Sequence, residues 1–77
     1  MALIRQFQRK ELARNSLHEE IDASYAVFER DGKVLVQIDS YGRKNREIPG
    51  KLSQTIQLDE QGAAQLVRIL KTAFGFN

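Results

Sequence analysis

The residues of this chain with the most evident catalytic chemistry are Ser16 and His18, which precede a short acidic cluster. On an extended segment the two side chains would point to the same face, as a nucleophile and its base must. No spacing identifies the third, orienting group of such a site. His18 is the only histidine, so Glu19, Glu20 and Asp22 lack nitrogen or sulfur partners for a metal. We expect surface residues here and no enzyme, with a small hydrolase centred on Ser16 and His18 as the alternative.

A second group of residues indicates binding rather than catalysis. The segment from Tyr41 to Lys51 contains two glycines, a proline and an asparagine, which predict a loop. It carries four cations against one glutamate: Arg43, Lys44, Arg46 and Lys51. The glycines match no phosphate-binding pattern, so we expect no cofactor, and the lack of a second histidine or a cysteine predicts no metal. The alternative is a charged loop that is simply solvated.

The length and composition of the chain limit what it can be. Its 77 residues allow one domain, residues 1–77, with a small core. There is no cysteine, so disulfides cannot compensate for that small core, and self-association as a homodimer is expected to do so. The net charge of +2 is too small to indicate a partner. No run is long enough to span a bilayer, and the amino-terminal residues lack the apolar core of a signal peptide, so we expect a cytoplasmic protein.

Residues 25–41 predict the hairpin that must position these groups. Two runs rich in β-branched and aromatic residues flank Asp31-Gly32, a strong two-residue turn signal because both positions tolerate positive φ. In the resulting register Arg30 pairs with Lys33, and Tyr25 pairs with Ile38. One side of the hairpin, here called the inner face, then carries Tyr25, Val27, Val34, Val36 and Ile38. The other side, the outer face, carries Ala26, Phe28, Leu35, Gln37, Asp39 and Tyr41.

The remaining segments complete the predicted fold. Residues 52–58 alternate as a strand that adds to the hairpin. Asp59 is a natural N-cap for a helix from Glu60 to about Phe74, ended by Gly75, whose apolar stripe is expected to cover the inner face. Residues 2–7 predict a strand or extended arm, and residues 8–15 a short helix. The fold class is therefore α+β: an antiparallel β-meander of three to four strands packed against one long carboxy-terminal helix, with a short amino-terminal helix.

The outer face is the expected binding surface. Proteins that hold single strands combine cations with aromatic side chains that stack on bases. Here the candidate site for single-stranded DNA or RNA consists of the four loop cations and three hairpin residues, Lys33, Tyr41 and Phe28. Asp39 shares this face and would repel phosphate. The alternatives are that the basic amino-terminal arm covers Phe28 and Leu35, or that the protein is an interaction module or structural dimer that binds no nucleic acid.

Three stretches of sequence, taken in order, have a counterpart in a known family. They are Gly-Lys-Val-Leu-Val-Gln-Ile at 32–38, Pro-Gly-Lys at 49–51 and Ile-Gln-Leu-Asp-Glu-Gln at 56–61, which opens a helix containing Leu66 and Leu70. Across residues 25–72 the chain resembles the positive cofactor four family of single-stranded-DNA-binding transcriptional coactivators. The resemblance implies a dimer in which each curved sheet presents a channel for a single strand, and a role in transcription regulation.

Overall fold

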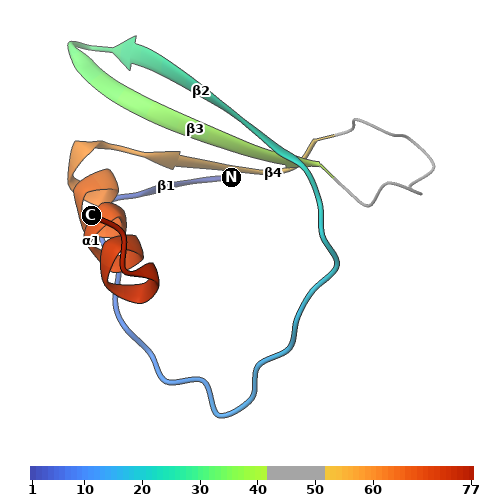
Figure 1. Cartoon of the computed structure of the whole chain (residues 1–77). Coiled ribbons are helices and arrows are strands. Elements are labelled where there is room, and N and C mark those ends of the chain that lie inside the picture. Colours follow the sequence, from blue (N-terminus) through green and yellow to red (C-terminus); the bar gives the residue numbers. More distant parts are fainter. Residues whose placement is uncertain (42–51) are drawn as a thin grey trace.

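The computed structural model describes residues 1–41 and 52–77. These residues form β1 (Ala2–Ile4), β2 (Ala23–Arg30), β3 (Lys33–Tyr41), β4 (Leu52–Leu58) and α1 (Glu60–Phe74). The four strands make one sheet in the order β1-β4-β3-β2, and α1 follows directly from the end of β4 (Figure 1). The predicted α+β class is confirmed. No helix in the described part of the chain combines the length and the apolar character needed to cross a membrane.

The hairpin of β2 and β3 has the predicted register. Arg30 pairs with Lys33 and Tyr25 with Ile38, and the pairing continues to Ala23 and Ser40. Asp31 and Gly32 have φ values of 53° and 75°, so both turn residues occupy the left-handed region. Asp and Gly tolerate this region better than other residues, and such turns match the natural twist of the two strands. The division into an inner and an outer face is therefore correct.

The prediction of a purely antiparallel meander is wrong at one edge. β2, β3 and β4 are consecutive antiparallel neighbours, but β1 pairs with β4 in parallel, with Ala2 opposite Ile56 and Ile4 opposite Leu58. The connection from β1 to β2, residues 5–22, passes from one edge of the sheet to the other (Figure 1). Because β1 runs parallel to β4, it also runs in the same direction as β2, so the chain must return along the length of the sheet before β2 begins, which takes a long connection. The sheet is therefore mixed.

The predicted amino-terminal helix is also wrong. Residues 8–15 have no helical hydrogen bonding, and every one of them is exposed, Leu12 included. A helix of two turns gains too few hydrogen bonds to offset its nucleation cost unless it packs on the rest of the protein. Because Leu12 finds no such contact, the segment has no reason to become helical.

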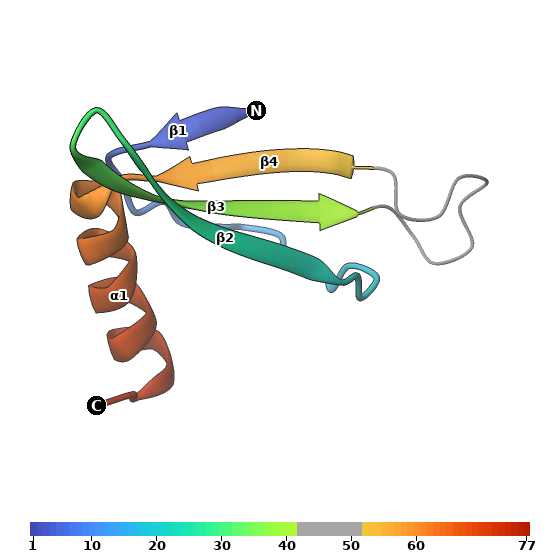
Figure 2. The ribbon, with the colours of Figure 1, turned by 90° about the horizontal axis from the view of Figure 1, so that it is seen from above.

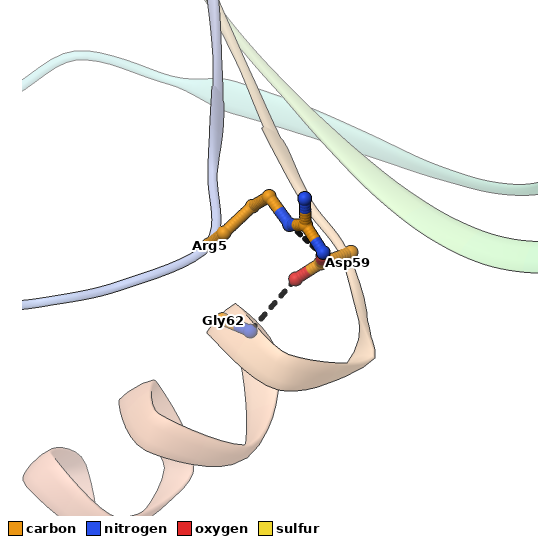
Figure 3. Close-up of polar contacts among 3 residues, drawn as sticks. All are labelled: Arg5, Asp59 and Gly62. Atoms are coloured by element: carbon orange, nitrogen blue, oxygen red, sulfur yellow. Dashed lines mark hydrogen bonds and ion pairs between the residues drawn. The ribbon is translucent and has the colours of Figure 1, made fainter.

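Helix α1 begins and ends where predicted. The Asp59 side chain accepts a hydrogen bond from the Gly62 N–H at 2.8 Å, and Gly75 ends the helix with φ of 70°. Figure 3 shows that the same carboxylate also pairs with Arg5, whose Nε lies 2.9 Å from the Asp59 Oδ2 atom. Asp59 therefore caps the helix and ties it to the segment that follows β1.

The first turns of α1 are held against the amino-terminal segment. Gly62 is buried, and a Cβ atom at this position would overlap the backbone oxygen of Ile4. One turn later, the Gln65 side chain accepts a hydrogen bond of 2.8 Å from the Phe7 N–H. These contacts place the beginning of α1 beside β1 and β4 at one end of the sheet.

Contrary to expectation, α1 does not cover the hairpin part of the inner face. The helix crosses the end of the sheet and extends beyond it (Figure 2). Tyr25, Val27 and Val34 are therefore 77%, 61% and 56% exposed. The physical reason is that no loop separates β4 from α1, so Asp59 and the contacts with residues 4–7 fix the direction of the helix. The apolar stripe of α1 is left open as well, with Val67, Leu70 and Phe74 exposed.

The cap predicts how acid affects the helix. The Gly62 hydrogen bond lowers the pKa of Asp59, Arg5 lowers it further, and desolvation opposes both. A lowered pKa means that the charged carboxylate stabilises the fold above the ordinary value of 3.8, and that this contribution is lost as the pH falls through the lowered pKa. Asp59→Asn keeps a capping oxygen but removes the titration.

We expect the stability difference between wild type and Asp59→Asn to be constant near neutral pH and to shrink below about pH 4. Urea unfolding followed by circular dichroism at a series of pH values measures it. A difference that persists unchanged into strong acid would show that the carboxylate charge does not stabilise the cap.

Candidate nucleic-acid interface

The register of the three antiparallel strands extends the outer face from the hairpin to β4. Gln37 pairs with Gln57, and Asp39 pairs with Thr55, so all four side chains lie on the same side of the sheet as Phe28 and Leu35. Leu3 of β1 pairs with Gln57, so the Leu3 side chain also lies on the outer face. The inner face correspondingly continues through Ile56 and Leu58.

The outer face is open. Helix α1 and residues 5–22 both lie on one side of the sheet in Figure 1. That side is the inner one, because Leu58 on the inner face, just before α1, is only 6% exposed. The alternative in which the amino-terminal arm covers Phe28 and Leu35 is wrong: β4 and β3 lie between β1 and β2, and residues 5–22 lie on the inner side (Figure 1).

The outer face is also concave. Figure 1 shows the β2–β3 hairpin bending away from α1, toward the outer side of the sheet. β3 is half-buried on both faces from Leu35 to Tyr41, as expected for a central strand, and Phe28 is the half-buried residue of β2. A concave strip on a sheet can hold an extended ligand along its strands.

The candidate residues occupy defined positions on this strip. Lys33 and Arg30 pair at the turn, and Phe28 pairs with Leu35 next to them. At the opposite end, the Tyr41 hydroxyl lies 2.7 Å from the Ser24 hydroxyl, which fixes its ring against the outer side of β2. The sheet thus places two of the predicted aromatic residues on one surface, with Lys33 at the turn.

The four loop cations fall outside the described residues. Arg43, Lys44, Arg46 and Lys51 belong to residues 42–51, which lie between the end of β3 and the start of β4. Their contribution to the site remains a prediction from the sequence.

Between the aromatic residues lies a row of hydrogen-bonded polar side chains. Gln57 Nε2 donates to Gln37 Oε1 at 3.0 Å, and Gln37 Nε2 donates to both oxygens of Asp39 at 3.1 and 3.3 Å. Thr55 Oγ1 completes the row with a 2.8 Å bond to Asp39 Oδ1, and this threonine is buried. We refer to Gln57, Gln37, Asp39 and Thr55 as the polar row.

Half of the polar row can be placed on the outer face from the sequence alone. The hairpin register alone places Gln37 and Asp39 on the outer face, but the predicted site contains none of the four residues of the row. The alternation of Thr55 and Gln57 with Ile56 and Leu58 is a signal that they share one face. Placing Thr55 and Gln57 beside Asp39 and Gln37 also requires the pairing register of β3 with β4. That register is irregular between Ser40 and Tyr41, and a long stretch of sequence separates the two strands.

The cations of the amino-terminal arm gather elsewhere. Arg9 and Lys10 line an open groove of about 690 Å³ against α1, together with Phe7, Ile69 and Arg68. Arg9 also pairs with Glu11 at 3.5 Å. Because this groove lies beside α1, the basic arm does not add charge to the outer face.

The hydrolase alternative gains no arrangement within the described residues that would support it. Ser16 and His18 lie in residues 5–22 and are both exposed. Within residues 1–41 and 52–77, no three histidine, cysteine or acidic side chains are grouped as a metal site would require. Comparisons of the chain with protein-family models, with curated proteins and with solved structures find no match.

Proposed function

We propose that this protein binds single-stranded DNA or RNA, without catalysis, along the outer face of its sheet. The observation that carries the proposal is the open concave strip between Lys33 and Tyr41, with Phe28 in the same strip. At about 3.3 Å per residue β3 is roughly 26 Å long, room for on the order of four nucleotides, which is near the small end of site sizes for single-strand binders. Tyr41, the last residue before the basic segment 42–51 in sequence, pairs with Leu52, the first residue after it, at this end of the strip.

The chemistry of the strip suits a flexible strand better than a duplex. A single strand can turn its bases toward Phe28 and Tyr41, each stacked base contributing about 1–3 kcal/mol. Its phosphates can then contact cations at the two ends, Arg30 and Lys33 at the turn and the loop cations beyond Tyr41. The resemblance to the positive cofactor four family supports the same assignment, and a role in transcription regulation rests on that resemblance alone.

We also propose that the binding protein is a homodimer. Among the described residues, Leu58 is the only buried large apolar side chain, which is far less than a stable domain of this size requires. The open helix stripe, the exposed inner face of the hairpin and the stacked pair Phe74–Phe76, with ring centroids 5.4 Å apart, provide apolar surface for a second copy. The outer face stays free in such a dimer.

Titration with fluorescent oligonucleotides tests the proposal. We expect binding to a single strand to weaken with salt by about 0.7 log units per log unit of salt for each phosphate contacted. Combined replacement of Arg43, Lys44 and Arg46 by glutamine should weaken binding to every sequence and lower the salt slope by about 2.

The matched control removes the same charge from the arm, by replacing Arg9, Lys10 and Arg14 with glutamine. This variant should bind nearly as wild type does. Equal losses in the two variants would indicate diffuse charge attraction, and absence of binding at low salt would refute the proposed function.

The second candidate is a structural dimer or interaction module that binds no nucleic acid. It is favoured by the same exposed apolar surface, which does not itself require a ligand on the outer face. A dimer that leaves oligonucleotides unbound at low salt, and that yields one stoichiometric protein partner after nuclease treatment, would establish this candidate instead.

A further inference from the structure

The orientation of the polar row is fixed by the carboxylate at its centre. An ionised Asp39 can only accept hydrogen bonds, so Gln37 must present its amide nitrogen to Asp39 and its oxygen to Gln57. Gln57 in turn must donate its nitrogen to Gln37, which leaves the Gln57 oxygen as an acceptor. One charged group thus sets the direction of every amide in the row.

The hydrogen-bonding capacity left over on this surface includes donors and acceptors, since the amide nitrogens of Gln37 and Gln57 each keep one N–H, but the charged group among them is an acceptor. Asp39 Oδ1 already accepts from Thr55 and Gln37, but Oδ2 accepts only the longer bond of 3.3 Å. Gln57 Oε1 accepts none of the hydrogen bonds found within the described residues. A partner that approaches the middle of the outer face therefore meets a negative charge, two available oxygens and the remaining N–H groups of Gln37 and Gln57, and the negative charge favours a donor over an acceptor.

This surface distinguishes the parts of a nucleotide. A phosphate approaching Asp39 is repelled, whereas the amino group of a base is attracted as a hydrogen-bond donor. Cytosine carries an amino group at the position where uracil and thymine carry a carbonyl oxygen. Two carbonyl oxygens also flank the ring N–H of uracil, so its edge opposes a carboxylate where that of cytosine favours it.

We propose that the polar row selects bases that carry an exocyclic amino group, and that strands bind with their bases toward the sheet. The inference rests on the proposed function, because it specifies that the bases of the bound oligonucleotide contact the outer face. Asp39, which on sequence alone argues against a nucleic acid, becomes the specificity-determining residue. If the protein makes a charge-assisted hydrogen bond to one oligonucleotide and lacks it with another, its affinities for the two differ by about tenfold.

Two oligonucleotides that differ only in this group and in the proton on the adjacent ring nitrogen provide the test. Oligodeoxycytidine and oligodeoxyuridine of equal length have the same backbone and comparable stacking, and mildly alkaline buffer keeps the cytosine strand unstructured. We expect wild-type protein to bind the cytosine strand about tenfold more tightly. Equal affinity for the two strands would overturn the inference while leaving the proposed function intact, and failure to bind either strand would refute both.

The two variants Asp39→Asn and Asp31→Asn distinguish an effect of the polar row on base preference from an effect of the total charge of the protein. Both variants remove one negative charge from the same hairpin, but Asp31 lies in the turn, where asparagine also tolerates positive φ. We expect D39N to bind the uridine strand more tightly and to lose most of the tenfold preference, and D31N to keep it. A preference that survives in D39N would remove Asp39 from the explanation.

A measurement on the wild-type protein covers the case in which D39N does not fold. The side-chain NH₂ resonances of Gln37 and Gln57 should shift when the cytosine strand is added and should shift much less with the uridine strand. Equal shifts with both strands would contradict the proposed selection.

Discussion

Replacing Leu70 by glutamate is expected to dissociate the proposed dimer and to unfold most of the chain. Leu70 lies in the middle of the open apolar stripe of α1, between Leu66 and Phe74, and is exposed in the single chain. If a second copy covers this stripe, the substitution loses the burial of two leucines per dimer, about 3–6 kcal/mol. That loss weakens association by roughly 10²–10⁴-fold. A chain with so little buried apolar surface has no comparable reserve of stability as a monomer.

Sedimentation and thermal unfolding at several protein concentrations measure this effect. The wild-type midpoint should rise with concentration, because dimerisation stabilises the folded state by mass action. Ala64→Glu is the control, since it introduces the same charge at an exposed position about 120° around α1 from Leu70, outside the apolar stripe, and should leave the proposed dimer intact. A wild-type protein that is monomeric, with a midpoint independent of concentration, would contradict the dimer.

Gly62→Ala is expected to destabilise the protein although alanine is the better helix former. At an uncovered helix position this change would stabilise the fold by up to about 1 kcal/mol. At Gly62 the new methyl group overlaps the backbone oxygen of Ile4, so the helix or β1 must shift. Overpacking of this kind costs about 1–3 kcal/mol, which outweighs the gain in helix propensity.

Urea unfolding at one fixed protein concentration decides the sign. Gln61→Ala serves as the control on the neighbouring exposed position, where we expect a change within about 0.5 kcal/mol. A stabilised Gly62→Ala variant would mean that α1 does not pack closely on the segment after β1.

The elements that the sequence predicts correctly are those with local signals. The Asp31-Gly32 turn determines the hairpin register from two adjacent residues, and Asp59 and Gly75 mark the two ends of α1. The position of α1 relative to the sheet depends instead on contacts with residues 4–7, which are more than fifty positions away in sequence. Nothing local encodes them, and the expected cover over Tyr25 and Val27 was wrong for that reason.

The residues of the candidate site also fall into two groups, those that the sequence places correctly and those that it does not place. Phe28, Lys33 and Tyr41 could be placed on the outer face by counting along the hairpin. Thr55 and Gln57 require the pairing of β3 with β4, and the long connection between these strands does not specify it. On sequence alone, Asp39 argues against nucleic-acid binding, whereas its hydrogen bonds make it a candidate residue for recognising bases. The full set of these hydrogen bonds is known only once the pairing of β3 with β4 is known.

The central claim is that a single strand binds along the outer face, and the two tyrosines of the chain allow a direct test. Tyr41 lies on the outer face with Phe28, whereas Tyr25 lies on the inner face. In aromatic NMR spectra recorded while a short single-stranded oligonucleotide is added, we expect the ring resonances of Tyr41 and Phe28 to shift and those of Tyr25 to stay unchanged. Shifts of Tyr25 alone, or no shift of any ring at saturating oligonucleotide, would contradict the claim.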